Sequence, residues 1–399
     1  MMSIRDIIKS SIFLFLVISG LLLSTIPILS RKLLTHTRLQ GVSPEIDLHY
    51  LLLERSIRIH NDVDKSKYPF IKGSGTKNDP YIIENILLDM TRFDEHEGIS
   101  IKDTNKYIVI RNCKLLSKQD NKPYTFSFYY IPIYSIGIHI YNSSNIIIRN
   151  VTFESLSMGI WLERSSEIYI EKNLLSTDIG LIIRDSKEII IASNRINTKK
   201  IPILLHQYLN KHDYSTLNFI NNTVNSRPVE VIKDTTDLIL ANRIIGHLIL
   251  INTRNITIIN IKIINGFLQI ISSQQCYFNE ISIIGYLGII SYYSNNCTFN
   301  KIIVRKGFLS IKLSSCRYFH FEHSDFDNQY GLIIDGSSVE DYIHFFENDV
   351  LFSGLPVKII VNQNNSIIRN MKLNYLIYIL YLSSSKITYK LLSPVKVRK

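Results

Sequence analysis

The stretch GISIKDTNKYIVIRNCKL, residues 98–115, decides the fold because later parts of the chain repeat its pattern. Each copy has a glycine, a short alternating strand, a polar turn, a second alternating strand and a final apolar pair. The clearest copies are GIHIYNSSNIIIRNVTF (137–153), GIWLERSSEIYIEKNLL (159–175) and GLIIRDSKEIIIASNRI (180–196). Weaker copies continue to VKIIVNQNNSIIRNMKL (357–373).

A repeat of about 22 residues with three short strands is typical of a β-solenoid, in which each coil stacks on the one before. A leucine-rich repeat of similar length would need a helical stretch, which the pattern lacks. We therefore predict an all-β fold, a parallel β-helix of about twelve coils with three short strands each, over residues 68–385. Turn asparagines at one repeating position predict an amide ladder along the axis: Asn112, Asn150, Asn242, Asn260 and Asn370.

Side chains alternate along a strand, so the pattern also assigns faces. On the first strand of the early coils, isoleucines and leucines such as Ile99 and Ile138 point inward. Two columns point outward: Ser100, His139, Trp161 and Ile182, and beside them Lys102, Tyr141, Glu163 and Arg184. Aromatic rings next to charged groups suit sugar rings or a protein partner.

An insertion at residues 118–135 is rich in aromatic side chains and enters this same strand. We expect it to fold over the edge of the face. The predicted ligand-binding residues are therefore His139, Tyr141, Trp161, Glu163, Arg184, Tyr129 and Tyr130.

Residues 1–32 are predicted to target the chain to a membrane. Arg5 and Lys9 precede an uncharged segment, residues 11–30, and Arg31 and Lys32 follow it. At about 1.5 Å per residue this segment is long enough to cross the hydrocarbon layer. It indicates a transmembrane anchor or a signal helix, and so a body anchored outside the cytoplasm or secreted.

The end of a β-helix exposes an apolar coil that must be covered. Within a linker at residues 33–67, Ser43 and Pro44 precede Ile46, Tyr50 and Leu53, which predicts a short capping helix. The stretch GSGTKNDPYIIEN (73–85) then starts the first coils. It lacks the Lys-Ser/Thr and the following helix of a phosphate loop. Residues 386–399 form a basic tail.

The run SIRIHNDVDKSKYPFIKGSGTKNDPYIIENILL (56–88), followed by residues 98–115, resembles the opening of right-handed parallel β-helix repeat proteins. These form the NosD-like, carbohydrate-binding and sugar-hydrolase group, common as archaeal surface proteins. The resemblance covers about residues 56–375 and implies a right-handed parallel β-helix. Its relatives include polysaccharide-cleaving enzymes and periplasmic proteins of copper-enzyme maturation, so the fold transfers but the function does not.

Catalytic residues are weakly indicated. Glycoside hydrolysis needs two carboxylates that face each other, and the strand pattern offers only Asp325, Asp327 and Asp335. The pectin-degrading β-helix enzymes carry four sequence motifs. This chain has only a partial match to one of them, at Ser176–Asp178. Cys316, His320 and His323 are residue types that bind metal ions, but they do not share a strand face. We predict no metal site and no cofactor.

Cys276 and Cys297 recur in equivalent Cys-x-Phe settings on neighbouring coils. Their spacing would allow a disulfide, and a stack of buried thiols is the preferred interpretation.

The formal charge of +11 is not gathered into clusters, so no nucleic-acid partner is predicted. An outward apolar column on the second strand suggests self-association or cover by the N-terminal segment: Val109, Ile147, Tyr169 and Ile190. The preferred function is a non-catalytic surface protein that binds glycan or another surface protein. The alternatives are a polysaccharide hydrolase or lyase, and a structural stalk.

Overall fold

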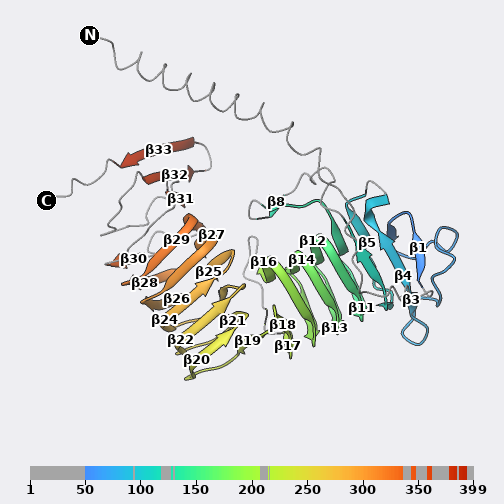
Figure 1. Cartoon of the computed structure of the whole chain (residues 1–399), viewed down its shortest axis with the longest axis horizontal. Coiled ribbons are helices and arrows are strands. Elements are labelled where there is room, and N and C mark those ends of the chain that lie inside the picture. The colour runs from blue at the N-terminus through green and yellow to red at the C-terminus, as the bar shows by residue number, and fades with distance from the viewer. Residues whose placement is uncertain are drawn as a thin grey trace, which may run out of the picture. The chain divides into compact units, whose positions relative to one another are not determined.

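The computed structural model describes residues 50–92, 95–117, 131–206, 214 and 216–335, together with short strands at 127–128, 343–346, 357–361, 377–383 and 386–392. Within these residues the chain consists of β-strands, with one 3-10 helix, η1 (Met90–Arg92) (Figure 1). Residues 11–30 lie outside the described ranges. No helix among the described residues is long and apolar enough to cross a membrane.

The first half of the chain is a stack of coils with one strand in each of three parallel sheets. The first sheet contains β2 (Ile57–His60), β5 (Glu97–Lys102), β10 (Ile136–Tyr141) and the second halves of β12 (Thr152–Glu163), β14 (Leu174–Arg184) and β16 (Arg195–His206). The second sheet contains β3 (Tyr81–Glu84), β6 (Ile108–Arg111), β11 (Ser144–Arg149), β13 (Ser166–Glu171), β15 (Lys187–Ala192) and β17 (Asn218–Ile220). The third contains β1 (Leu51–Leu53), β4 (Ile86–Asp89), β7 (Lys114–Leu116), the first halves of the three long strands and β18 (Thr223–Val224). The predicted right-handed parallel β-helix is confirmed.

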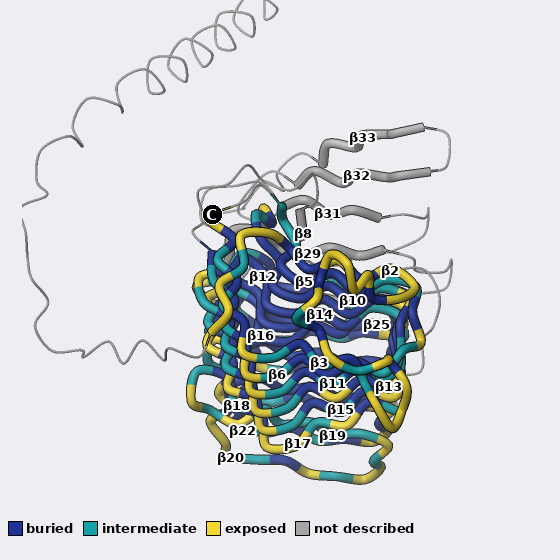
Figure 2. Tube along the Cα trace, turned by 90° about the vertical axis from the view of Figure 1, so that its right-hand side faces the viewer, coloured by how far each residue is buried: buried dark blue, intermediate teal, exposed yellow. Residues whose placement is uncertain are grey.

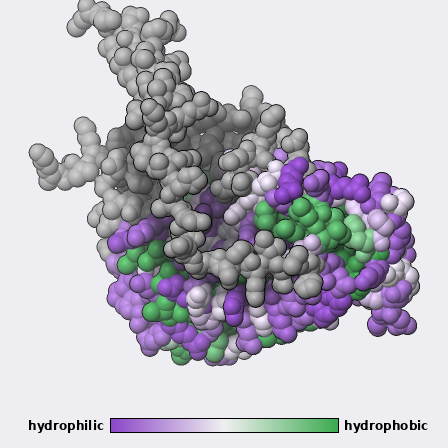
Figure 3. Space-filling model, turned by 45° about the vertical axis from the view of Figure 1, so that its right-hand side comes forward, coloured by the Kyte–Doolittle hydropathy of each residue, from purple (hydrophilic) through white to green (hydrophobic). Residues whose placement is uncertain are grey.

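The core lies inside the coils, as the alternation predicts. Ile99, Ile138 and Ile160 stand in register on three neighbouring rungs, and all are fully buried. Figure 2 shows buried residues lining the inside of the coils, with exposed residues along their outer turns. The outer surface in Figure 3 is largely hydrophilic, with separate hydrophobic patches.

The corner between the first and second sheets contains residues with left-handed backbone. Asn142 (φ 45°) and Asn145 (φ 62°) are examples, and asparagine tolerates this conformation better than most residues. Inside the corner runs a ladder of hydroxyls. The Ser143 N–H donates to Ser165 Oγ (3.2 Å), and the Ser165 N–H donates to Ser186 Oγ (3.0 Å).

The predicted asparagine ladder exists, but largely at another position. Asn112 and Asn150 are exposed left-handed turn residues. The buried ladder lies one residue later in the repeat, where Asn173 Nδ2 donates to Asn194 Oδ1 (2.9 Å) and Asn194 Nδ2 donates to Asn222 Oδ1 (3.0 Å). In the second half of the chain, Asn260 Nδ2 donates to Asn242 Oδ1 (2.7 Å), as predicted, on the exposed surface. Asn370 lies outside the described residues.

The start of the stack corrects one prediction. Residues 51–53 form strand β1, parallel to β4, where a capping helix was predicted. The Leu51 N–H donates to the Asn85 carbonyl (2.8 Å), so this segment pairs with an edge that a helix would leave unpaired. The glycine-rich loop does precede the first full coils. Gly73 has φ 87°, and a Cβ there would lie 1.9 Å from the Pro80 carbonyl oxygen.

A second stack follows after a break that the sequence did not predict. Strands β18 and β19 (Arg227–Lys233) pair antiparallel, and β19 then begins a new run of parallel rungs. One column is β19, β21 (His247–Ile251), β23 (Leu268–Ile271), β25 (Leu287–Tyr292), β27 (Ile303–Ser314) and β29 (Asp325–Asp335). The other is β20 (Ile239–Ile245), β22 (Thr257–Ile264), β24 (Tyr277–Ile284), β26 (Asn295–Asn300), β28 (Arg317–Glu322) and β30 (Ile343–Phe346).

Two small sheets complete the described strands. β31 (Val357–Val361) is parallel to β32 (Ile377–Ser383), which pairs antiparallel with β33 (Lys386–Leu392). Part of the predicted basic tail is therefore a strand. β8 (Ser127–Phe128) and β9 (Ile131–Pro132) form a hairpin within the aromatic insertion.

A side-chain amide joins the two stacks. No later strand among the described residues pairs with the first-sheet half of β16. Instead, the Leu205 N–H donates to Gln269 Oε1 (3.2 Å) and Gln269 Nε2 donates to the Leu205 carbonyl (2.5 Å). Gln269 is fully buried and takes the place of the missing neighbouring strand.

All four cysteines are free and buried, which confirms the predicted thiols of Cys276 and Cys297. Their Sγ atoms donate to the Gln274 and Asn295 carbonyls (both 3.5 Å).

Asn194→Ala is expected to lower the free energy of unfolding by about 2–4 kcal/mol, because it removes the side-chain acceptor of the Asn173 N–H and the side-chain donor to the Ile170 carbonyl inside the coil. Chemical denaturation measures this loss. Asn197→Ala is the matched control, since Asn197 is exposed and lies three residues later, in β16. Equal stability of the two variants would contradict the role of the ladder.

Gln269→Leu keeps the apolar volume of the junction but removes both hydrogen bonds to Leu205. We expect a loss of about 2 kcal/mol in the free energy of unfolding. Faster proteolysis near residues 207–228 should accompany it. Gln274→Leu, at an exposed position of the next turn, should leave both measurements unchanged.

Candidate functional site

The two predicted outward columns of the first sheet are in register. Trp161 lies opposite His139 on one neighbouring rung and Ile182 on the other, and Glu163 lies between Tyr141 and Arg184. The column is nevertheless not the open face that was predicted. His139, Trp161 and Glu163 are each only 7% exposed.

Within this buried column the side chains contact one another. The His139 and Trp161 rings stack with centroids 4.5 Å apart and planes 13° apart. His139 Nδ1 lies 2.6 Å from Glu97 Oε1, and Arg184 Nη2 lies 2.9 Å from Glu163 Oε1. These contacts hold four rungs of the first sheet together.

Glu97 is ionised despite its burial. Desolvation disfavours its charged form, but the hydrogen bond from His139, the charge of His139 and that of Lys102 outweigh it and lower the Glu97 pKa to about 2. Lys102 Nζ lies 3.2 Å from Glu97 Oε2. The cluster is therefore a buried ion-pair network rather than a poised acid or base.

Of the predicted ligand-binding residues, Tyr141 reaches the most accessible position. It ends β10 at the corner, is half-buried, and accepts a hydrogen bond at Oη from Arg164 Nη1 (3.2 Å). The Arg164 guanidinium lies 5.9 Å from the centre of the Tyr141 ring. Tyr129 and Tyr130 lie outside the described residues.

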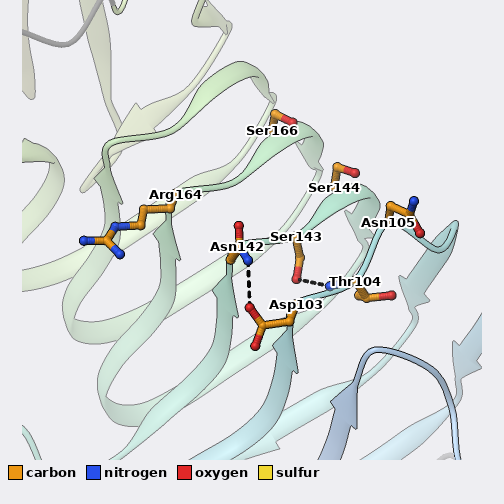
Figure 4. Close-up of a pocket in the computed structure, with 8 residues that line it drawn as sticks. All are labelled: Asp103, Thr104, Asn105, Asn142, Ser143, Ser144, Arg164 and Ser166. Carbon is orange, nitrogen blue, oxygen red and sulfur yellow. Dashed lines mark hydrogen bonds between the residues drawn. The ribbon is translucent and has the colours of Figure 1, made fainter.

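Beside Tyr141, this corner forms an open polar groove of about 400 Å³. Figure 4 shows two rows of side chains that follow the stacking direction. One row is Asp103, Asn142 and Arg164, and the other is Asn105, Ser144 and Ser166. Between them lie Thr104 and Ser143, where the Thr104 N–H donates to Ser143 Oγ (3.2 Å).

The groove has rigid walls. Asn142 Nδ2 donates to Asp103 Oδ1 (2.7 Å), and Asn145 Nδ2 donates to the Asn105 carbonyl (3.0 Å). Asp103, Asn142 and Arg164 all have left-handed backbone. Sequence reasoning missed this row because it concentrated on strand positions. The polar residue that follows each first strand was the signal that could have found it.

A second polar groove, of about 460 Å³, lies at the opposite end of the first-sheet strands. Register shifts between Glu154 and Leu156 and between Thr177 and Ile179 mark β-bulges on two neighbouring strands. The lining residues are Ser117, Ser155, Leu156, Ser176, Thr177, Asp178, Asn197 and Lys199. The partial pectinase motif at Ser176–Asp178 thus lies in a groove, but Asp178 is buried and paired with Lys200 Nζ (2.8 Å).

Of the weak catalytic candidates, only Asp325 has a described side chain. Asp325 Oδ2 lies 2.8 Å from Arg305 Nη2. Asp327 and Asp335 lie on β29 with Asp325, opposite Arg305 and Ser314 of β27. Their side chains are outside the described set.

No group of three or more His, Cys, Asp or Glu side chains suited to a metal ion occurs among the described residues. Cys316 Sγ donates to the Ser314 carbonyl (3.4 Å), while His320 contacts Glu322 and His323 faces Asn300. Burial raises the pKa of Cys113 to about 11, which disfavours the thiolate that binds metals.

Glu97→Gln is expected to lower the free energy of unfolding by on the order of 2 kcal/mol near neutral pH, because it removes a buried charged hydrogen-bond acceptor. Folding lowers the Glu97 pKa from 4.5 to about 2, so ionised Glu97 stabilises the fold above pH 4.5 and this contribution is lost as the pH falls towards 2. The difference between wild type and variant should therefore shrink over that range. Denaturation at several pH values measures it, with Glu280→Gln, from the exposed pair with Lys301, as the control.

Comparison with known proteins finds a family model similar to part of this chain. A family model described as periplasmic copper-binding protein (NosD) matches residues 60–258. The description names copper, yet the described residues offer no ligand cluster that fits it. No curated protein matches the chain.

Solved structures with similar coils share little sequence. PfbA, a surface adhesin of Streptococcus pneumoniae, is 9% identical with a TM-score of 0.29, over 78% of this chain and 90% of that one. A hyperthermoactive exopolygalacturonase from Thermotoga maritima is 11% identical with a TM-score of 0.27, over 86% of this chain and 85% of that one. Neither similarity carries an inference about activity. Over residues 60–258 the chain is therefore similar to the NosD family, and its parallel coils form a right-handed parallel β-helix.

Proposed function

We propose that this protein is a non-catalytic surface protein outside the cytoplasm that binds glycan in the corner groove beside Tyr141. The observation that carries the proposal is the pair of polar rows, Asp103–Asn142–Arg164 and Asn105–Ser144–Ser166, around an open groove of about 400 Å³.

Sugar hydroxyls both donate and accept hydrogen bonds, so a glycan site needs donors and acceptors side by side. The groove supplies a carboxylate at Asp103, an amide at Asn105, hydroxyls at Ser144 and Ser166 and a guanidinium at Arg164. The Tyr141 ring at its edge adds a flat apolar surface of the kind on which sugar rings pack. Because the rows repeat about every 4.8 Å along the stack, the groove suits an extended chain better than a single small ligand.

The buried first-sheet column supports this groove from behind. Trp161 and His139 are packed inside, so a ligand would have to displace them to reach their rings. We therefore assign them, with Glu97, Glu163 and Arg184, to holding the rungs that carry Tyr141 and Arg164. In this proposal these residues support the groove and do not contact the ligand themselves.

The proposed location follows from two features. The matching family model describes periplasmic proteins, and residues 11–30 form an uncharged segment long enough to cross a bilayer. We propose that this segment holds the body outside the cytoplasm, or is cleaved after export.

The test is a glycan-array screen of the full-length chain in mild detergent, with reducing-sugar release measured on the same glycans. We expect binding without release. Arg164→Ala should weaken binding about tenfold, which is the cost of losing one charged hydrogen bond.

Arg195→Ala provides a matched control, because Arg195 is exposed and lies away from the groove. Binding that survives Arg164→Ala and Asn142→Ala unchanged would reject the groove. Release of sugar would instead favour an enzyme and direct mutagenesis to Asp325, Asp327 and Asp335.

A further inference from the structure

The outer face of the second sheet carries an uninterrupted apolar stripe. Ile82, Val109, Ile147, Tyr169 and Ile190 lie side by side on five neighbouring parallel strands. Tyr169 is 46% exposed and Ile82, Ile147 and Ile190 are half-buried, whereas Val109 is buried. On β17 the register position belongs to Asn218, and the exposed Ile220 lies two residues further along. An apolar column continued over successive coils of a soluble surface is a sign of an interface.

Charged side chains stand at both ends of the stripe. At the start of β13 and β15, a depression of about 410 Å³ is lined by Glu167, Tyr169, Glu188, Ile190, Thr216 and Asn218. Glu167 and Glu188 make its rim acidic, although Lys187 Nζ lies 3.6 Å from Glu188 Oε1. At the far end of β11 stands Arg149, which is partly exposed and lies in register between Arg111 of β6 and Glu171 of β13. Arg149 makes no ion pair with another described side chain.

We infer that a second copy of this chain docks on this face, with Arg149 of each copy entering the acidic depression of the other. A two-fold axis lying in the interface brings the carboxyl end of β11 in one copy to the amino ends of β13 and β15 in its partner. The aliphatic stem of Arg149 would lie along the Tyr169 ring, and its guanidinium would reach Glu167 and Glu188.

Charge and polarity favour a second copy of the chain over a membrane surface or a glycan as the occupant of this face. Glu167 and Glu188 would repel an anionic membrane surface. A glycan would leave Ile147 and Ile190 in contact with hydroxyls instead of apolar atoms. A copy of the same face presents both the apolar stripe and the matching cation.

The size of the face predicts a weak dimer. Six strands about 4.8 Å apart and three to six residues long cover roughly 400–500 Å² per copy. A stable interface buries about 800 Å² per partner, so association should depend on concentration. Confinement to a membrane surface would raise the local concentration.

Light scattering and sedimentation of the full-length chain in mild detergent, up to about 100 µM, test this inference. We expect a concentration-dependent dimer in the wild type. Arg149→Glu should weaken dimerisation at least tenfold by placing like charges together, and Arg149→Glu combined with Glu167→Arg should restore it. Circular dichroism verifies that each variant is folded.

Arg195→Glu is the control, because it makes the same charge change on another face. A wild type that is monomeric at every concentration would overturn the inference. So would a dimer that neither Arg149→Glu nor Tyr169→Ser weakens, since association would then come from elsewhere in the chain. The affinity of a single corner groove for a short soluble oligosaccharide should be the same in all these variants, which separates this test from that of the groove.

Discussion

The structure depends on how each coil satisfies the backbone groups at its corners. Along the sheets, N–H and carbonyl groups pair from rung to rung, but a corner turns these groups into the interior, where water cannot reach them. Ser165 shows the solution: its hydroxyl donates to the Glu163 carbonyl (2.7 Å) and accepts from the Ser143 N–H (3.2 Å). Asn173, Asn194 and Asn222 do the same at the corner between the second and third sheets. One small polar side chain per corner therefore keeps the isoleucine columns in register.

The same corners carry the proposed binding groove. Thr104, Ser143 and Ser165 must point inward to complete the ladder, so the left-handed residue before each of them points outward. Asp103, Asn142 and Arg164 occupy these outward positions. The interior side of the corner is constrained by folding, whereas the exterior side can vary in chemistry without disturbing the ladder. Binding chemistry can thus differ between members of one fold while the coils stay the same.

The sequence predicted the features that depend on local repetition. The three strands per coil, the inward isoleucines and the alignment of His139 with Trp161 all follow from alternation and a constant period. It did not predict that Trp161 is buried, because alternation says which side of a sheet a residue lies on but not what covers that side. The predicted capping helix is wrong over Leu51–Leu53 for a similar reason, because the edge of β4 provides hydrogen bonds that a helix could not make.

The break between the stacks also escaped prediction, since the repeat resumes after it with almost the same period. At the break, the strands change the neighbours with which they pair. That pairing depends on contacts between residues that are distant in the sequence. Gln269 pairs with Leu205, 64 residues earlier. No local pattern marks this glutamine as different from an exposed one. Only the free edge of β16 explains why an amide is required at that place.

The groove and the apolar face lie on the same strands, and this proximity has a consequence. β11 and β13 begin at Ser144 and Ser166 in the groove and carry Ile147 and Tyr169 on the face, about 10 Å further along each strand. A dimer formed through the face would therefore hold two grooves at a fixed separation, because parallel coils are rigid over this distance. A repeating glycan that engages one groove would meet the second at a high effective concentration. Two weak interactions on adjacent parts of one sheet could in this way produce strong attachment to a polymeric surface, without either site being tight alone.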